Sequence, residues 1–199
     1  MTQEQVISWL VKPTLFLLCL VPLGLFSFDV VTENLSADPI KDATLFTGEW
    51  TLRFLLITLC VTPLKRLIGW PQLIKFRRML GLFAFFYAFL HFLVWFWLDR
   101  ELQLGDVIED ILKRPYITVG FSAFVLLIPL ALTSNKFSIR RLKQRWRKLH
   151  KLVYIIAGLG VLHFLWLVKA DVQEPIIYGG ILIILLSMRA WWERRDRAS

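Results

Sequence analysis

The chain of 199 residues alternates between apolar stretches and shorter polar segments. The apolar stretches are residues 9–28, 45–64, 80–98, 115–132, 149–168 and 176–192. Each is a candidate transmembrane helix, because about 20 apolar residues in a helix span the hydrocarbon core of a bilayer. The second is the weakest candidate, since Glu49 and Arg53 lie in its first turns, although charges four residues apart partly neutralise each other. The pattern predicts an all-α integral membrane protein, a six-transmembrane-helix bundle that forms one domain over residues 1–199 and has no internal repeat.

The polar segments between these stretches alternate in charge. Segments 29–44, 99–114 and 169–175 carry net charges of −3, −2 and −1, whereas segments 65–78 and 133–148 carry +5 and +7. Lys and Arg are enriched in loops on the cytoplasmic side of membrane proteins. The alternation therefore predicts that both termini lie in the cytoplasm and that the acidic loops lie outside.

Composition agrees with a membrane protein and excludes several function classes. The chain is 57% hydrophobic, whereas a soluble domain is about 45–50% apolar. The net charge of +9 falls in clusters between apolar stretches, so it does not indicate nucleic-acid binding. Cys19 and Cys60 both lie in apolar stretches, which argues against a disulfide framework or a zinc site. No Ser/His/Asp or Cys/His grouping indicates a hydrolase, and six spans leave no room for a soluble catalytic domain.

Two of the three histidines are predicted to lie at the same depth in the membrane. His91 comes 13 residues after Arg78, near the inner end of the third span, and His163 comes 14 residues after Leu149, at the inner end of the fifth. A rise of 1.5 Å per residue places both roughly 20 Å from the inner surface. Histidine inside a membrane is costly and usually functional. The matched depth predicts a haem iron held between two axial imidazoles, although nearby small residues (Gly81, Ala84, Ala88, Gly160) would also suit plain helix packing.

The third histidine and one intramembrane arginine have more than one interpretation. His150 lies at the cytoplasmic edge, where it could bind a second haem with an unusual partner, contact a quinone or flavin, or begin a helix. Arg77 and Arg78 occupy the matching inner positions on the third span. Arg53 could contact a haem propionate, since arginine suits carboxylates, or could extend its charge to the headgroups.

Several segments resemble a known family, over about residues 30–180. They are Ala-Asp-Pro-Ile-Lys-Asp at 37–42, Phe-Thr-Gly at 46–48, Thr-Pro-Leu at 62–64, Arg-Arg-Met-Leu-Gly-Leu at 77–82, Arg-Pro-Tyr-Ile-Thr-Val-Gly at 114–120, Leu-His at 149–150 and Ile-Tyr-Gly-Gly at 177–180. With His91 and His163, these segments resemble the haem-binding membrane subunits of bacterial methionine-sulfoxide reductase systems, the MsrQ (YedZ) family, within the ferric-reductase-like transmembrane domains.

The resemblance implies an electron-transfer subunit of the bacterial inner membrane rather than the sulfoxide-reducing catalytic subunit. It implies b-type haem with His91 and His163 as axial ligands, a role for His150, and flavin mononucleotide (FMN) as a further cofactor. Electrons would come from the quinone pool or a cytosolic flavin reductase. They would pass to a periplasmic molybdopterin-dependent subunit that reduces methionine sulfoxide in oxidised envelope proteins.

The chain departs from the wider ferric-reductase pattern in two ways. It has no cytoplasmic nucleotide-binding domain, so direct NADPH oxidation is not expected. It also lacks a second histidine on the third span, so a second bis-histidine haem is not expected. Three alternatives stay open: a ferric-reductase-like haem oxidoreductase with another acceptor, a small proton-coupled transporter, and a non-catalytic anchoring subunit.

Overall fold

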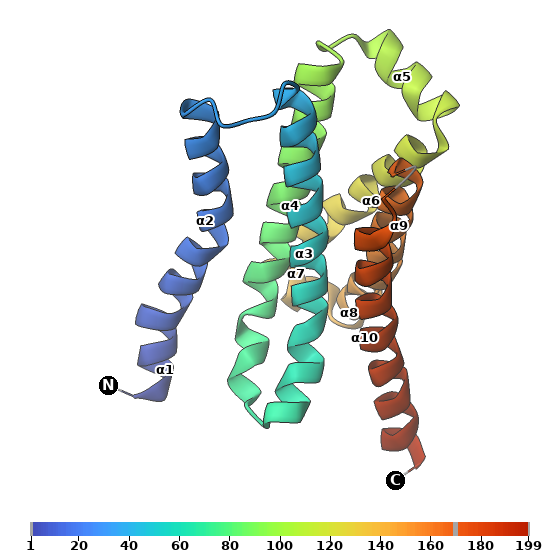
Figure 1. Ribbon diagram of the computed structural model, residues 1–199. Coiled ribbons are helices and arrows are strands. Elements are labelled where there is room, and N and C mark those ends of the chain that lie inside the picture. Colours follow the sequence, from blue (N-terminus) through green and yellow to red (C-terminus); the bar gives the residue numbers. More distant parts are fainter. Residues whose placement is uncertain (1, 169–170, 199) are drawn as a thin grey trace.

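The computed structural model describes residues 2–168 and 171–198, and all regular structure in these ranges is helical (Figure 1). Residues 169 and 170, in the last predicted acidic segment, lie outside these ranges, as do Met1 and Ser199. In chain order the elements are α1 (Gln3–Val6), η1 (Ile7–Val11), α2 (Lys12–Val31), α3 (Pro39–Ile68), η2 (Pro71–Lys75), α4 (Arg77–Leu93), η3 (Val94–Asp99), α5 (Leu104–Lys113), α6 (Pro115–Leu132), α7 (Lys136–Leu142), α8 (Gln144–His150), α9 (Leu152–Leu167) and α10 (Gln173–Ala198).

Within residues 2–168 and 171–198, five helical segments are long and apolar enough to cross a membrane. They are Glu4–Val31, Pro71–Asp99, Pro115–Leu132, Gln144–Leu167 and Gln173–Arg197. These segments confirm the first, third, fourth, fifth and sixth predicted spans. The second predicted span, residues 45–64, lies in α3, which is not one of the five, so the count of six stays a prediction.

The α3 helix lies at the centre of the bundle and contacts α4, α9 and α10. Its start is fixed by Asp38, whose side chain accepts a hydrogen bond from the Lys41 amide, and by Pro39 in the first turn. Its end is fixed by Gly69 in the left-handed conformation, at a φ of 69°. The middle of α3 is almost fully enclosed, with Leu52, Phe54, Leu55, Leu56 and Leu59 all buried.

A proline inside α3 is compensated by an arginine of the last helix. Pro63 has no N–H, so it cannot bond the Leu59 carbonyl four residues earlier, and that acceptor would be left open in an apolar interior. Arg189 of α10 donates to the Leu59 carbonyl at 2.5 Å and to the Tyr154 hydroxyl of α9 at 2.9 Å. Arg189 therefore joins α3, α9 and α10. The sequence analysis missed this residue, although its signal was a lone arginine inside the sixth apolar stretch.

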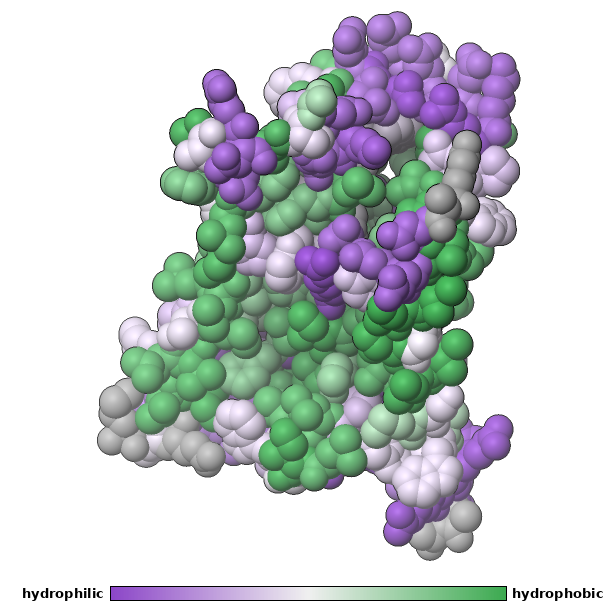
Figure 2. All heavy atoms as spheres, viewed as in Figure 1, coloured by the Kyte–Doolittle hydropathy of each residue, from purple (hydrophilic) through white to green (hydrophobic). Residues whose placement is uncertain are grey.

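The outer faces of the bundle carry a broad apolar band. On the face drawn in Figure 2, hydrophobic side chains cover most of the middle and lower part, and hydrophilic ones gather near α5, at the end of α10 and in a patch toward the upper middle. Leu17, Leu25 and Ile183 are each about two-thirds exposed. A band of this kind is typical of a surface that contacts lipid rather than water. The α1 helix and the end of α10 lie at the same end of the bundle, opposite α5 (Figure 1).

Candidate functional site

A cavity of about 910 Å³ lies between α3, α4, α6 and α9. Its walls are largely apolar, with Leu52, Phe92 and Phe124 among them, and most of its charged lining residues lie in loops or at helix ends, whereas Glu49 lies inside α3. His91 from α4 and His163 from α9 both line the cavity, as their predicted equal depth requires. An apolar cavity of this size, with a few convergent polar groups, is typical of a cofactor site.

The two imidazoles are spaced to share one metal atom. Their ring centroids lie 6.2 Å apart, with the ring planes at 76°. A bond of about 2 Å from each ring nitrogen to one metal, plus roughly 1 Å from that nitrogen to each ring centre, gives a separation of roughly 6 Å. In the part of the chain that the structure describes, no group of three or more His, Cys, Asp or Glu side chains could hold a metal ion. A metal at this position would therefore bring most of its ligands with it, as haem iron does.

Each imidazole is oriented by a backbone carbonyl. His91 Nδ1 lies 2.9 Å from the Thr44 carbonyl oxygen and 3.2 Å from the Thr47 hydroxyl, both on α3. His163 Nδ1 lies 2.7 Å from the Tyr116 carbonyl oxygen on α6. A carbonyl only accepts, so in each ring Nδ1 carries the proton and Nε2 keeps its lone pair. A bond of this kind fixes the tautomer and the ring orientation of metal-binding histidines.

A glycine lies against each imidazole. A Cβ at Gly48 would come 3.1 Å from His91 Cε1, and a Cβ at Gly120 would come 2.7 Å from His163 Nδ1. Contacts this short are rarely or never made by real Cβ atoms, so each ring lies in space that only glycine leaves open. The sequence analysis missed both residues. The signal was their place in the Phe-Thr-Gly and Thr-Val-Gly segments.

Residues that line the cavity correspond in pairs at a spacing of 72, which relates the α3–α4 hairpin to the α6–α9 hairpin. Adding 72 to a residue number converts one half of the lining into the other, so that His91 corresponds to His163 and Gly48 to Gly120. The hydrogen-bond partners repeat as well, because Thr44 precedes His91 by 47 residues and Tyr116 precedes His163 by 47. Other pairs of lining residues related in this way are Thr51 and Ala123, Leu52 and Phe124, Leu55 and Leu127, Ala88 and Gly160, and Phe92 and Phe164. Half of these eight pairs are identical residues, and they lie scattered along the chain, so the spacing is hard to recognise in the sequence alone.

Of the four small residues noted in the sequence, two line the cavity. Ala88 and Gly160 are lining residues. Gly81 instead lies against Thr58 of α3, since a Cβ there would be 3.7 Å from the Thr58 methyl group, and Ala84 is fully buried outside the lining. Packing of α3 against α4 therefore accounts for these two residues.

Arg53 does not line the cavity. Its guanidinium donates to Glu49 at 2.6 Å and to the Tyr178 hydroxyl at 2.9 Å, and it lies 4.9 Å from the centre of the Trp50 ring. Glu49 and Tyr178 therefore satisfy this intramembrane charge, without the headgroups.

His150 lies away from the cavity, at the end of α8. Its Nε2 is 3.0 Å from the Thr133 hydroxyl, and its ring stacks on Trp146 with centroids 3.9 Å apart. Trp146 in turn donates to the Thr133 carbonyl at 3.0 Å. Arg77, half-buried at the start of α4, is close enough to act electrostatically on His150, whereas Arg78 is exposed. The 72-residue spacing makes Arg78 the counterpart of His150.

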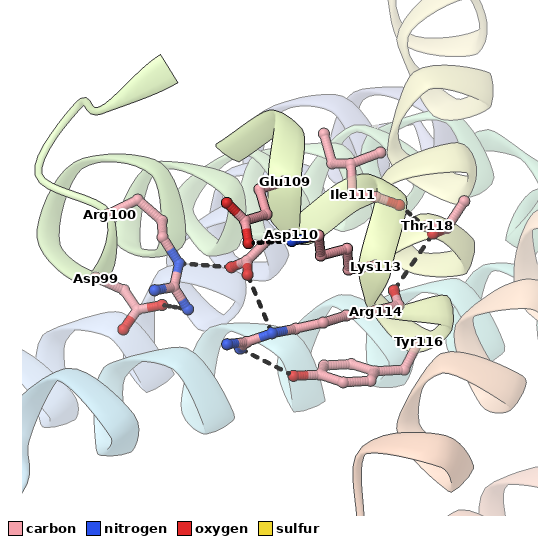
Figure 3. Close-up of polar contacts among 9 residues, drawn as sticks. All are labelled: Asp99, Arg100, Glu109, Asp110, Ile111, Lys113, Arg114, Tyr116 and Thr118. Carbon is pink, nitrogen blue, oxygen red and sulfur yellow. Dashed lines mark hydrogen bonds and ion pairs between the residues drawn. The ribbon is translucent and has the colours of Figure 1, made fainter. Parts of the chain in front are cut away.

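A buried carboxylate joins two arginines at the α5 end of the cavity (Figure 3). Asp110 of α5 is 7% exposed and forms ion pairs with Arg100 Nε at 2.6 Å and Arg114 Nε at 3.0 Å. The Tyr116 hydroxyl, 3.5 Å from Arg114, and the Asp110 carboxylate hold the pKa of Arg114 above its ordinary value. The sequence analysis counted these residues only as loop charges.

The turn before α5 brings Asp110 and Arg100 together. Glu101 and Leu102 have φ values of 48° and 63°, which are uncommon for residues other than glycine. Backbone hydrogen bonds from Leu102 to Phe96 and from Gln103 to Arg100 hold the turn. Two consecutive left-handed residues with side chains each cost on the order of 1 kcal/mol, so this geometry is maintained by its surroundings.

Several known proteins are similar to this chain. The family described as ferric reductase like transmembrane component matches residues 47–161. The "Protein-methionine-sulfoxide reductase heme-binding subunit MsrQ" of Herminiimonas arsenicoxydans is 50% identical over 192 residues, which cover 95% of this chain and 88% of the relative. The proteins with the same name from Bordetella pertussis and Xanthomonas campestris pv. campestris are 48% and 54% identical, over 94% and 80% of this chain and 93% and 73% of their own lengths. No solved structure matches the chain significantly.

Proposed function

Because the chain belongs to the MsrQ family of haem-binding membrane subunits, within the ferric-reductase-like transmembrane proteins, we propose that His91 and His163 are the axial ligands of a b-type haem. The observation that carries the proposal is the pair of imidazoles 6.2 Å apart, each with Nδ1 bonded to a carbonyl and Nε2 left for a metal. Bound haem would supply a one-electron redox couple.

The residues around the cavity would each have a defined task. The Thr44 and Tyr116 carbonyls hold the two rings in position, and Gly48 and Gly120 leave room for them. The apolar walls exclude water and so favour electron transfer over side reactions. The protein is thus an electron-transfer subunit of a methionine-sulfoxide reductase system, and the sulfoxide chemistry belongs to its partner.

The proposed topology has six spans with both termini in the cytoplasm of a bacterium, in the inner membrane. The α3 helix is the sixth span. The common end of α1 and α10 in Figure 1 supports an even number of crossings, and the basic segments 65–78 and 133–148 support a cytoplasmic location for that end. The cavity then opens toward the periplasm.

Electrons enter at the inner side and leave at the outer side in this proposal. The donor is the quinone pool or a cytosolic flavin reductase, and FMN would belong to the inner side. His150, Arg77 and Arg78 supply a polar group there, with the arginines favouring anionic quinol or flavin. The acceptor is a periplasmic molybdopterin-dependent methionine-sulfoxide reductase subunit. The match to the wider ferric-reductase family favours, as the second candidate, a haem oxidoreductase with another acceptor.

A haem measurement on the purified protein tests the proposal. We expect a low-spin b-type spectrum and a whole-number haem content per protein from a pyridine haemochrome assay. His91→Ala and His163→Ala should each lose this haem, because one imidazole cannot maintain low-spin iron, whereas His150→Ala should retain it. A colourless wild-type protein, or wild-type haem content and spectrum in both histidine variants, would overturn the proposal.

A further inference from the structure

The cavity has largely apolar walls, and most of its charged lining residues belong to the loops and helix ends outside the helical walls. The cationic ones are Lys41 in the first turn of α3, Arg100 before α5 and Arg114 after it; the acidic ones are Asp38, Asp99, Glu101 and Asp171, with Glu49 deeper in α3. Haem has an apolar ring and two propionate carboxylates on one edge. That edge needs cationic partners, which Arg100 and Arg114 supply in this lining.

Arg100 and Arg114 are held from behind by one buried carboxylate. Asp110 pairs with the Nε of each arginine, at 2.6 Å and 3.0 Å, and this single negative charge is shared between two guanidinium groups. A guanidinium has five N–H donors, so pairing through Nε leaves terminal N–H groups for a second acceptor. One terminal nitrogen of Arg100 lies 3.1 Å from Asp99, and one of Arg114 donates to the Tyr116 hydroxyl at 3.5 Å, so each guanidinium keeps further terminal N–H groups for another acceptor.

Arg114 is also tied to one of the imidazoles. It is two residues before Tyr116, whose carbonyl orients His163 and whose hydroxyl lies 3.5 Å from the Arg114 guanidinium. A group bound by Arg114 would therefore be fixed relative to the His163 ring. The correspondence at a spacing of 72 breaks at this point, since the counterpart of Arg114 is Asp42. The α6 half therefore has an arginine where the α3 half has an aspartate.

We propose that Arg114, with Arg100 beside it, binds the haem propionates, and that Asp110 is the positioning residue that holds both arginines. Arginine matches the planar geometry of a carboxylate and can bond it through two N–H groups. Contact with the haem propionates is thereby assigned to Arg114 and Arg100 and not to Arg53, whose partners are Glu49 and Tyr178. This assignment rests on the proposed function, since it requires haem in the cavity.

The test compares haem with haem dimethyl ester, which has no carboxylate charge. Wild-type protein, Arg114→Gln and Arg53→Gln are produced in haem-depleted cells, purified whole in detergent and loaded with either compound. Release to excess apomyoglobin is then followed by absorbance. Because a hydrogen bond to a charged group contributes about 1.5–3 kcal/mol, Arg114→Gln should release haem roughly 10- to 150-fold faster than wild type while keeping its low-spin spectrum.

Arg53→Gln is the matched control, because it removes an arginine of the same bundle that does not line the cavity. We expect wild-type release from this variant. Wild type and Arg114→Gln should release the dimethyl ester at the same rate, because the ester has no carboxylate for Arg114 to bind. Asp110→Asn should reduce the difference between haem and its ester, an effect that a general loss of stability would not produce.

Three results would overturn the assignment: wild-type haem release from Arg114→Gln, an equal effect of this variant on haem and ester, or faster release from Arg53→Gln alone. A wild-type protein that binds no haem would instead refute the proposed function. The two failures are thus distinguishable.

Discussion

The glycine beside His163 allows a quantitative prediction. In Gly120→Ala, the new Cβ would lie 2.7 Å from His163 Nδ1, 2.8 Å from Cε1 and 3.0 Å from Cγ. Because an ordinary contact begins near 3.4 Å, the ring must move by 3.4 − 2.7 = 0.7 Å. The ring cannot move freely, since Nδ1 is bonded to the Tyr116 carbonyl at 2.7 Å and, in our proposal, Nε2 binds iron.

The expected cost follows from the size of this displacement. Inserting a methyl group into a well-packed site typically costs about 1–3 kcal/mol, which corresponds to roughly a 5- to 150-fold loss of haem affinity. Gly48→Ala should have a smaller effect, because its Cβ would lie 3.1 Å from the His91 ring and needs a shift of only 3.4 − 3.1 = 0.3 Å. The 72-residue spacing thus supplies two equivalent positions with different clearances.

The assay is titration of haem into haem-free protein in detergent, followed by the low-spin absorption band. Gly158→Ala is the control, because Gly158 lies in α9 with His163 and a Cβ there would meet no atom within 4 Å. This variant has the same gain in helix propensity, about 1 kcal/mol, without the contact. We expect the loss of affinity to be greatest for Gly120→Ala, smaller for Gly48→Ala and absent for Gly158→Ala. Equal affinities in Gly120→Ala and Gly158→Ala would refute the reasoning.

Three further predictions concern the topology, the inner side and the packing of α3. Reporter fusions should be cytoplasmic in segments 65–78 and 133–148 and periplasmic in 29–44 and 99–114, and an opposite result at any one segment would refute the six-span topology. His150→Ala should keep at least part of the haem but slow its reduction by quinol or reduced flavin, while dithionite still reduces it quickly; wild-type rates with every donor would limit His150 to packing. Arg189→Gln should destabilise the protein by about 1–3 kcal/mol in a denaturation assay, because the Leu59 carbonyl loses its donor. When Arg189→Gln is made in Pro63→Ala, where the missing N–H is restored, the loss of stability relative to Pro63→Ala alone should be smaller. An equal loss of stability with and without Pro63→Ala would contradict the explanation.

The sequence predicted the arrangement of the two histidines because helix geometry alone determines depth. Residue counts from the start of each span gave His91 and His163 the same level, and both line one cavity. The same reasoning gave no information on what contacts the rings. Thr44, Gly48, Tyr116 and Gly120 come from other helices, and their contacts depend on how those helices rotate and pack.

The arginines show a different limit of sequence analysis. Arg53 drew attention because it lies inside an apolar stretch, but Glu49 one turn away and Tyr178 on α10 satisfy its charge. Arg114 was counted only as a loop charge. Its approach to the cavity depends on a turn with positive φ at Glu101 and Leu102, and neither residue type indicates such a conformation.

The 72-residue spacing has a consequence for how this protein matures. The helical hairpin α3–α4 holds His91 with its own carbonyl and glycine, and the hairpin α6–α9 holds His163 with an equivalent set. Each hairpin is thus a half-site that can be complete before the other has entered the membrane. A cofactor that binds both half-sites links the two hairpins, and its binding free energy adds to the stability of the assembled bundle. In cells short of haem, the two hairpins would be joined only by direct packing, such as that of α3 on α9 and of α4 on α6, and the assembled bundle would be less stable.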